Sequence, residues 1–407
     1  MTHFITLQHQ PKISGVINHL PASKSISNRV LIIQALCQGK AAIANLSEAN
    51  DTRLMQQLIV SSDEEINAED AGTTMRFLTS YFAIMGLPKL LTGTYRMKQR
   101  PIHLLVNALQ KIGAHIVYTE KEGFPPLKIQ GGFIQKTNHI TIRGDVSSQF
   151  ISALLLVAPA LPQGLILQLE GKISSRPYID MTLSLMRTFG IYPQVTDTRI
   201  EVPSGRYKPV AYIVEPDWSA ASYWFAFVAL AKEAELILPR VAMKSVQGDQ
   251  VIIDIMEQLG VKAEPRGNDL LITHKEHRQS FSWDFTDCPD LAQTVAVVCA
   301  AKGIKATFTG LESLKIKETD RTMALTIELA KLGATFNLRG DAWHLTPAQK
   351  LPDTLAPIHT YLDHRMAMAF APLCMMWKVQ IENPGVVRKS YPHFWHDVRS
   401  VGINAVE

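Results

Sequence analysis

The feature that most constrains this chain is an internal repeat, in which a helical stretch ends at a glycine and an alternating strand pattern follows. Full copies end at Gly113, Gly190, Gly260 and Gly333. Glycine stops a helix at this position because it adopts the left-handed conformation at little cost. The hairpin after Gly333 is the clearest, with alternating residues on both sides of a turn at 339–341. Weaker copies lie at 54–60 and at 398–403. The pattern predicts an α/β protein of repeated folding units.

A second class of helix is more apolar and begins at small polar or acidic residues. Its starts are Ser25, Gly72, Ser147, Asp217, Asp287 and Asp363. Pairing the two helix classes gives six units, each with about four strands. An open solenoid is one arrangement of such units. The buried character of the second class favours compact bundles with sheets packed outside. Three units per domain is the natural division, with a crossing near 215–217, so we expect one domain at 23–214 and another formed by 1–22 and 215–407.

Composition narrows the class of protein. The chain has 407 residues, of which 46% are hydrophobic and 19% charged, as in folded globular proteins. A net charge of +4 is too mild for a nucleic-acid partner but suits small acidic substrates. Apolar runs such as 366–377 are too short to cross a membrane, and the N-terminus lacks a signal-peptide pattern. The four cysteines form no CxxC pair, so we expect reduced thiols in a cytoplasmic protein.

The stretch Pro21-Ala22-Ser23-Lys24-Ser25-Ile26-Ser27-Asn28-Arg29 resembles a tight turn that enters a helix. We expect Ser25 or Ser27 to cap that helix. The exposed N–H groups and the dipole of a helix start attract anions, and Lys24 and Arg29 add two full charges. An ordinary capped helix with two solvated cations is the alternative. Repetition of the arrangement along the chain favours an anion site.

Other helix starts carry residues of the same kinds: cations, hydroxyls, glycine and carboxylates. Gly72 permits close approach of a ligand to the backbone, and Asp290 is expected in the first turn of a helix capped by Asp287. Neither GxxxxGK[ST] nor GxGxxG occurs, so nucleotide binding is not indicated. No His, Cys and Asp spacing is typical of a metal site, and we expect none. The remaining clusters are 96–100, 147–149, 174–178, 315–321, 363–365 and 388–392.

Six of these motifs together resemble the 5-enolpyruvylshikimate-3-phosphate synthase family. They lie at 21–29, 71–76, 96–102, 147–150, 317–321 and 363–368, and they follow the family's order over nearly the whole chain. The resemblance implies an inverse α/β barrel fold: two similar domains, each of three βαβαββ units, that face each other across an active-site cleft. It also implies transfer of the enolpyruvyl group of phosphoenolpyruvate to the 5-hydroxyl of shikimate 3-phosphate, with release of phosphate, on the route to chorismate and the aromatic amino acids.

The resemblance also implies roles for individual residues, without a metal or an organic cofactor, in an enzyme expected to be a monomer. Asp290 is the expected base on the 5-hydroxyl, and Glu318 with Lys24 the expected proton carriers at the enol carbon. Phosphoenolpyruvate is expected to contact Lys24, Gly72, Arg100, Gln149, Arg321, Arg365 and Lys389. Shikimate 3-phosphate is expected to contact Ser25, Arg29, Ser147, Ser148, Gln149, Ser175, Tyr178, Asp290 and Lys317.

The chain departs from the family pattern in four places. Asp70 stands where Asn is frequent, Ser313 where an amide is common, and Phe77 where Pro is common, and the segment 60–70 is short. Asp70 and Ser313 are therefore left out of the expected contacts. The resemblance further implies that the protein is a target of the herbicide glyphosate, with Gly72 typical of sensitive members.

Two other functions compete with this interpretation. The related enzyme that transfers enolpyruvyl to a UDP-linked amino sugar usually carries a reactive Cys in the loop that corresponds to 96–100, and this chain has none there. A non-catalytic repeat scaffold is the other possibility. Such a scaffold has no need for so many cations beside glycines and hydroxyls, so the shikimate enzyme is favoured.

Overall fold

The computed structural model describes residues 3–37, 39, 41–145 and 147–407, and the chain divides into two compact units. Unit 1 comprises Met1–Ala22 and Glu215–Glu407, and unit 2 comprises Ser23–Val214. The chain therefore crosses between the units twice. On the unit 1 side the two crossing segments pair with each other, because Asp217 N–H donates to the Pro21 carbonyl (2.8 Å) and Ala22 bridges Pro216.

Unit 2 contains three sheets and six helices within its described residues. From one edge to the other, the strand orders of the three sheets are β4-β5-β7-β6, β8-β9-β11-β10 and β3-β12. The helices are α1 (Lys24–Leu36), α2 (Asn50–Leu58), α3 (Gly72–Ile84), α4 (His103–Ile112), α5 (Ser148–Val157) and α6 (Arg176–Thr188), with 3₁₀ turns η1 (Met97–Gln99) and η2 (Ala158–Ala160). The strands are β3 (Ile43–Ala44), β4 (Glu65–Asn67), β5 (Lys89–Thr92), β6 (Ile116–Tyr118), β7 (Leu127–Ile129), β8 (His139–Arg143), β9 (Leu165–Glu170), β10 (Gln194–Val195), β11 (Arg199–Val202) and β12 (Tyr212–Ile213).

Unit 1 repeats this plan with strands from both ends of the chain. Its sheets are β20-β1-β21, β2-β13-β15-β14 and β16-β17-β19-β18. The helices are α7 (Trp218–Leu230), α8 (Ile252–Leu259), α9 (Ala292–Ala301), α10 (Arg321–Ala330), α11 (His364–Phe370) and α12 (Phe394–Ser400), with 3₁₀ turns η3 (Gly248–Val251), η4 (Pro289–Leu291), η5 (Glu312–Ile316), η6 (Ala371–Met375) and η7 (Pro384–Lys389). The strands are β1 (Phe4–Leu7), β2 (Lys12–Val16), β13 (Glu233–Leu238), β14 (Val261–Arg266), β15 (Asp269–His274), β16 (Ser280–Asp284), β17 (Lys305–Thr309), β18 (Thr335–Arg339), β19 (Ala342–Thr346), β20 (Val379–Glu382) and β21 (Ala405–Val406).

The four four-stranded sheets formed by the described residues share one topology. In each sheet, with the strands numbered in chain order, the first strand pairs parallel with the second. The second pairs antiparallel with the fourth, and the fourth pairs antiparallel with the third. In unit 2 the sheets that begin with β4 and β8 follow the same order. A parallel pair requires a crossover helix, whereas antiparallel neighbours are joined by a hairpin. The repeated unit is therefore β-α-β-α-β-β.

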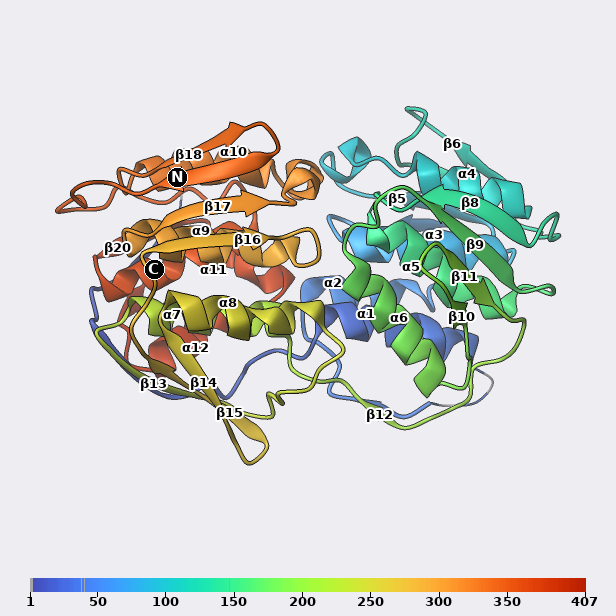
Figure 1. Ribbon diagram of the computed structural model, residues 1–407. Coiled ribbons are helices and arrows are strands. Elements are labelled where there is room, and N and C mark those ends of the chain that lie inside the picture. Colours follow the sequence, from blue (N-terminus) through green and yellow to red (C-terminus); the bar gives the residue numbers. More distant parts are fainter. Residues whose placement is uncertain (1–2, 38, 40, 146) are drawn as a thin grey trace. The chain divides into compact units, whose positions relative to one another are not determined.

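The helices of the second class form the core of each unit. Every residue of α7 except Ser219 is buried, and α9 and α11 are buried along their full lengths. A helix that is apolar on all sides must be surrounded by other elements. Within unit 1, sheet strands such as β16 and β17 lie outside these helices (Figure 1). Strands such as β8 alternate between exposed and buried residues, as expected for a sheet with one face on the core.

The glycine stops of the repeat are confirmed. Gly113, Gly190, Gly260 and Gly333 follow α4, α6, α8 and α10, and all have φ between 75° and 130°. The hairpin after Gly333 is also confirmed, as β18 and β19.

Two predicted caps are wrong. Ser23 caps α1 by accepting from Ile26 N–H (3.4 Å), because the helix begins at Lys24 and leaves Ser25 and Ser27 inside it. Ser27 instead accepts from Ser47 N–H (2.9 Å). Asp287 does not cap the helix that follows it. The 3₁₀ turn η4 comes first, with Cys288 at its cap position and Asp290 inside the turn.

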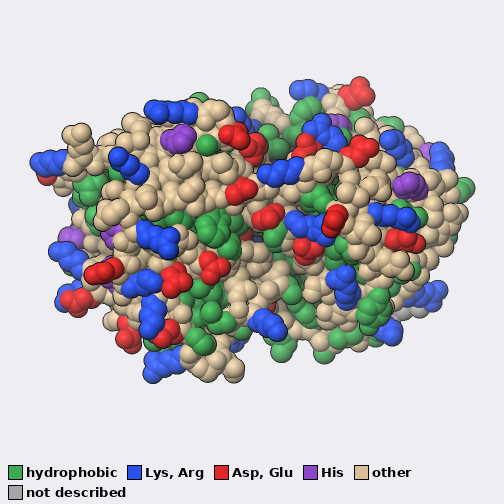
Figure 2. All heavy atoms as spheres, in the orientation of Figure 1, with side chains coloured by type: hydrophobic (Ala, Val, Ile, Leu, Met, Phe, Trp, Pro, Cys, Tyr) green, Lys and Arg blue, Asp and Glu red, His purple; other side chains and the backbone are tan. Residues whose placement is uncertain are grey.

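Charged side chains of both signs are interspersed over the face shown in Figure 2. This distribution agrees with the mild net charge of +4. None of the helices in the described part of the chain is both long and apolar enough to cross a membrane.

We predict that Gly113→Ala destabilises unit 2 more than Gly190→Ala does. Both glycines lie at left-handed φ, so both substitutions carry backbone strain of about 1–3 kcal/mol. A Cβ at Gly113 would lie 2.0 Å from the Ile134 carbonyl oxygen, whereas at Gly190 it would meet the flexible Lys208 side chain at 2.9 Å. The fixed backbone clash should add about 1–3 kcal/mol. Urea unfolding of both variants measures the difference, and equal losses would contradict the steric account.

Candidate active site

The site residues expected from the sequence fall into two groups, one in each unit. Unit 1 carries Asp290, Lys317, Glu318, Arg321, Arg365 and Lys389, and the others belong to unit 2.

Arg321, the first residue of α10, is the centre of the unit 1 group. Its side chain is 2% exposed, and its guanidinium contacts three carboxylates. Nε donates to Asp363 Oδ2 (2.7 Å), Nη1 to Asp290 Oδ1 (2.9 Å) and Nη2 to Glu318 Oε2 (2.9 Å). Burial acts to lower the pKa of Arg321, but the charges of Asp363, Glu318 and Asp290 outweigh it and raise the pKa. The side chain is therefore a permanent buried cation.

Asp290 links Arg321 to two further cations. Arg365 Nη2 donates to Asp290 Oδ2 (2.9 Å), and Lys317 Nζ lies 3.8 Å from Oδ1. Arg365 Nη1 also donates to the Asp290 carbonyl (3.2 Å), which fixes the backbone of η4. Burial acts to raise the pKa of Asp290, but the charges of Arg365, Lys317 and Arg321 hold it well below the ordinary range. Asp290 is thus a carboxylate, and a weak base while these contacts persist.

Glu318 completes the network. Its Oε2 accepts from Arg321, and its Oε1 lies 3.2 Å from Lys389 Nζ at the end of η7. The six predicted residues of unit 1 are therefore joined by a continuous chain of ion pairs. The connections run Lys317–Asp290, Arg365–Asp290, Asp290–Arg321, Arg321–Glu318 and Glu318–Lys389.

In unit 2, Lys24 lies in the first turn of α1, where Ser23 is the cap. Its Nζ donates to Asp51 Oδ2 (3.0 Å), in the first turn of the neighbouring α2. Both side chains are largely buried, so the pair is shielded from solvent screening. Asp51 thereby fixes the position of the Lys24 ammonium group.

Gly72 and Arg100 lie against each other. Gly72 is the first residue of α3, and a Cβ there would meet both Nη atoms of Arg100 at 2.7 Å. Arg100 follows η1 and donates weakly to the Asp70 carbonyl (3.5 Å). Gln149 joins this region, since its Nε2 donates to Thr73 Oγ1 (3.2 Å). The absence of a side chain at Gly72 is what lets the guanidinium approach the start of α3.

Arg29 is almost completely buried, with 3% of the residue accessible to solvent. Nε donates to Thr182 Oγ1 (2.7 Å), Nη2 to Ser152 Oγ (3.0 Å) and to the Tyr178 carbonyl (3.2 Å). Burial lowers the pKa of Arg29 to about 10, so it remains charged near neutral pH. Arg29 therefore ties α1 to α5 and α6 and supplies a fixed positive charge beneath their N-termini.

The hydroxyl-bearing residues lie at these N-termini. Ser147 caps α5 by accepting from Gln149 N–H (3.4 Å), and Ser148 is the helix's first residue. Ser175 precedes α6 with φ of 55°, a left-handed conformation that is uncommon for serine and clusters at functional sites. Tyr178 lies in the first turn of α6.

Several residues that build the site were not among the expected ones. Asp363 caps α11 and pairs with Arg321, and Asp51 pairs with Lys24. Tyr223 OH accepts from Arg365 Nη1 (3.4 Å), and burial raises the pKa of Tyr223 to about 12. Asp363 belongs to a noted motif and could have been found as a cap. Asp51 and Tyr223 carry no local signal, because their partners are distant in sequence.

Asp249 is a further buried carboxyl beside this network. Its Oδ2 accepts from the Ser219 hydroxyl, and its Oδ1 has no partner among the described residues. Burial, followed by the charge of Asp290, raises the pKa of Asp249 to about 7. No motif or spacing around Asp249 distinguishes it in the sequence.

Three of the departures from the family pattern, Phe77, Ser313 and Asp70, can be located in the structure. Phe77 places its ring 5.5 Å from the Arg29 guanidinium carbon, a cation–π contact that helps hold Arg29. The Ser313 hydroxyl, in η5, is buried without a partner among the described residues. Asp70 accepts from the Thr94 hydroxyl.

The two groups have the chemistry of anion binding and proton transfer. Unit 1 holds four cations, Lys317, Arg321, Arg365 and Lys389, against the three carboxylates Asp290, Glu318 and Asp363. Unit 2 offers Lys24, Arg29 and Arg100 beside four helix N-termini. Such cations and helix starts bind phosphate and carboxylate groups, while the acidic residues among them can exchange protons.

Comparison with solved structures identifies the fold. Two EPSP synthase structures from Acinetobacter baumannii match with TM-scores of 0.78, each covering 100% of both chains, at 20% and 19% identity. The fold is therefore the two-domain α/β fold of these enzymes, as predicted from the repeat and the resemblance.

Sequence comparison then identifies the family. The model of the family described as EPSP synthase (3-phosphoshikimate 1-carboxyvinyltransferase) matches residues 7–61 and 56–398. The chain is 46% identical to the 3-phosphoshikimate 1-carboxyvinyltransferase of Bacteroides fragilis, over 94% of each chain. It is 34% identical to that of Serratia proteamaculans, over 98% of this chain and 99% of the relative, and 35% identical to one from Escherichia coli, over 98% of each. The chain belongs to the EPSP synthase family.

We predict that Asp249→Asn removes a pH-dependent loss of stability from unit 1. The pKa of Asp249 is raised from 3.8 to about 7, so the folded state keeps a proton that the unfolded chain releases. The protonated Asp249 side chain therefore makes its full contribution to the wild-type free energy of unfolding below about pH 4. That contribution is lost as the pH rises through about 7, by up to about 4 kcal/mol.

The measurement is urea unfolding of both proteins between pH 4 and 8. The variant should gain stability relative to wild type as the pH rises. Asp254→Asn, at an exposed acidic position in α8, is the control and should show a constant offset. Parallel curves for wild type and Asp249→Asn would contradict the prediction.

Proposed function

We propose that this protein transfers the enolpyruvyl group of phosphoenolpyruvate to the 5-hydroxyl of shikimate 3-phosphate and releases phosphate. Family membership supports the reaction. The observation that carries the assignment of residues is the continuous ion-pair network of unit 1, because it joins all six residues expected there. A repeat scaffold has no use for a network that buries so many charges, since burying charge is costly.

Phosphoenolpyruvate, with a carboxylate and a phosphate, binds to Arg321, Arg365 and Lys389 in unit 1 and to Lys24 and Arg100 in unit 2. The contact between Gly72 and Arg100 supports this part of the proposal, because it puts a cation at a helix start. Gln149 reaches the same region through Thr73.

Shikimate 3-phosphate binds mainly to unit 2, at the starts of α1, α5 and α6. Hydrogen bonds come from the hydroxyl groups of Ser25, Ser147, Ser148, Ser175 and Tyr178. Arg29 supplies charge from beneath, and its many hydrogen bonds support a role in holding these helix starts in register. Asp290 and Lys317 contact the same substrate from unit 1.

Substrate binding itself prepares the catalytic carboxylates. Before a substrate binds, Arg321 and Arg365 neutralise Asp290, and Arg321 and Lys389 neutralise Glu318. A bound carboxylate or phosphate competes for the same N–H groups, which weakens those pairs and raises the pKa of Asp290. Asp290 then takes the proton of the 5-hydroxyl as its oxygen bonds to the enol carbon. Glu318 and Lys24 add a proton to the methylene carbon as that bond forms, and they remove one when the carbon–oxygen bond to phosphate breaks and phosphate leaves.

The proposal keeps the expectation of a monomeric cytoplasmic enzyme. The four cysteines are free thiols, and Cys288, Cys299 and Cys374 are buried, which suits a reducing compartment. The reaction uses no metal or organic cofactor.

A phosphate-release assay tests the function directly. Purified protein is incubated with phosphoenolpyruvate and either shikimate 3-phosphate or a UDP-linked amino sugar. We expect release only with shikimate 3-phosphate. Release with the sugar nucleotide instead would assign the protein to the related transferase, and no release with either acceptor would favour a scaffold.

Asp290→Asn should lose turnover by roughly 10²- to 10⁴-fold while it still binds shikimate 3-phosphate. The amide keeps the side chain's shape but cannot accept the hydroxyl proton, and it removes a negative charge close to an anion. Steady-state rates and calorimetric binding measure the two effects. Asp287→Asn, at an exposed acidic position three residues earlier, is the control and should remain active. Near-wild-type turnover of Asp290→Asn would move the base role to Glu318.

Gly72→Ala should weaken glyphosate binding more than phosphoenolpyruvate binding. The new methyl would lie 2.7 Å from both Nη atoms of Arg100, so the guanidinium must move. Crowding of this kind costs about 1–3 kcal/mol, roughly 5- to 150-fold in affinity, and the longer inhibitor should bear more of it. Wild type should be glyphosate-sensitive. The ratio of the inhibition constant to the phosphoenolpyruvate KM measures the effect, and an unchanged ratio would mean that Gly72 does not line the pocket.

A further inference from the structure

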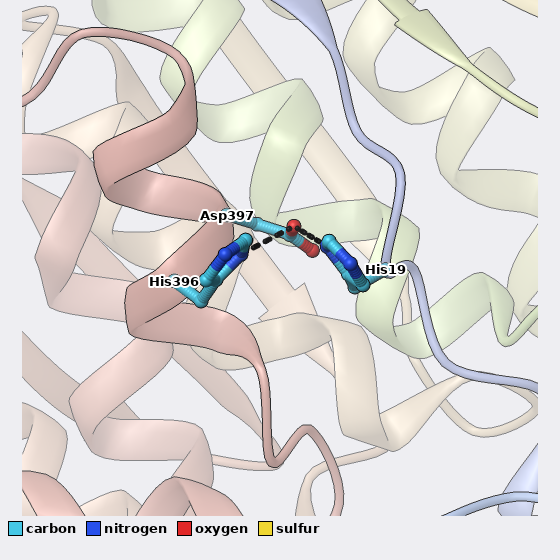
Figure 3. Close-up of side chains that lie close together, drawn as sticks. All are labelled: His19, His396 and Asp397. Atoms are coloured by element: carbon cyan, nitrogen blue, oxygen red, sulfur yellow. Dashed lines mark hydrogen bonds and ion pairs between the residues drawn. The ribbon is translucent and has the colours of Figure 1, made fainter.

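A cluster of histidines around one buried carboxylate lies in unit 1, among residues that the proposed reaction does not use. His19 comes from the segment that leads toward the first crossing, and His396 and Asp397 come from α12. His19 Nδ1 lies 2.8 Å from Asp397 Oδ1, and His396 Nδ1 lies 3.6 Å from the same oxygen. Figure 3 shows the two imidazoles on either side of the carboxylate.

The spacing of these atoms suits a small metal ion. One ligand atom from each of the three residues can be chosen so that all lie within 4.8 Å of one another. Four ligands at about 2.0 Å around a tetrahedral zinc ion are separated by roughly 3.3 Å. Small rotations of the two imidazoles are therefore enough to direct all three atoms at one point. Two imidazole nitrogens and one carboxylate oxygen are also a donor set that zinc accepts, with a further position open.

The carboxylate is held as metal-ligating carboxylates usually are, by a hydrogen bond to its other oxygen. The Tyr391 hydroxyl donates to Asp397 Oδ2 (2.6 Å), and Trp224 Nε1 donates to the Tyr391 oxygen (3.2 Å). Asp397, Tyr391 and Trp224 are all fully buried. The hydrogen bond from Tyr391 occupies Oδ2 and leaves Oδ1 as the oxygen of Asp397 that faces the histidines.

The two imidazoles are accessible from solvent. The His19 side chain is 44% exposed and that of His396 is 61% exposed, whereas Asp397 is 0% exposed. An ion can therefore reach the cluster without unfolding of the core. A third imidazole is near: the His393 ring centroid lies 5.4 Å from that of His19. His393 immediately precedes α12, three positions before His396, so both lie on one face of its first turn.

We propose that His19, His396 and Asp397 bind one divalent transition-metal ion of the zinc class, with His393 able to become the fourth ligand. The ion takes the place of the proton between His19 and Asp397. Binding ties the segment before the first crossing to α12, and so fixes the N-terminal end of unit 1 to its C-terminal helix. The proposal does not depend on the function assigned above.

The test is a titration of the untagged full-length protein with Zn²⁺ by calorimetry and with Co²⁺ by visible absorption. We expect one ion per chain, visible Co²⁺ bands of a four-coordinate site, and a rise in Tm when Zn²⁺ is added. His19→Ala and His396→Ala should each weaken binding more than tenfold and abolish the Tm rise. Tyr391→Phe should weaken it by about 10- to 100-fold, because it removes the partner that orients Asp397.

His139→Ala is the matched control, since His139 is an exposed histidine on β8 of unit 2. It should bind Zn²⁺ as wild type does. The exposed positions of His19 and His396 make both substitutions compatible with folding, and the Tm without metal verifies this. Absence of saturable binding, or binding that His19→Ala and His396→Ala leave unchanged, would overturn the proposal and leave the cluster as an ordinary ion pair.

Discussion

The structure of unit 1 depends on one buried guanidinium group. Arg321 contacts Asp290, Glu318 and Asp363, which come from η4, the loop before α10 and the cap of α11. These segments are far apart in the chain and carry charges that repel one another. The shared cation holds them together, and loss of one partner from such a buried group usually costs about 3–5 kcal/mol. The geometry proposed for catalysis is therefore part of what stabilises the fold.

The charge balance of this network explains why the site can be both stable and reactive. Four cations against three carboxylates leave it close to neutral without a ligand, so the buried charges are tolerated. A ligand with a carboxylate and a phosphate reverses that balance. In the proposed mechanism, part of the added negative charge is offset when Asp290 takes up a proton. In that mechanism, the same electrostatic requirement makes Asp290 a base when a substrate anion is bound.

The sequence was informative where a residue's role is local. The glycines that end α4, α6, α8 and α10 could be recognised because only the backbone conformation of one residue is at issue. The cap of α1 was assigned to the wrong serine, because several serines stand in a row and the helix can begin at any of them. The motif residues of unit 1 were found through resemblance to a family, and the structure then joined them in one network.

Residues whose partners are distant in the chain could not be found in this way. Asp249 is unusual only because it is buried beside Asp290, and burial is a property of the folded unit. His19 and Asp397 are 378 positions apart, so no spacing rule for metal ligands applies to them. Arg29 was expected to face a ligand, and its burial against Thr182 and Ser152 became apparent only when α1, α5 and α6 were packed together.

In the proposed mechanism, substrate anions release Asp290 from its ion pairs and so make it basic. Carboxyl ¹³C NMR of aspartate-labelled protein tests this most directly, with the Asp290 signal assigned by its absence in Asp290→Asn. Without ligand, the signal should show a pKa well below the ordinary aspartate range, because Arg365, Lys317 and Arg321 surround the carboxylate. With phosphoenolpyruvate bound and no acceptor present, the pKa should rise toward that range. A pKa that stays equally low in the complex would contradict the account.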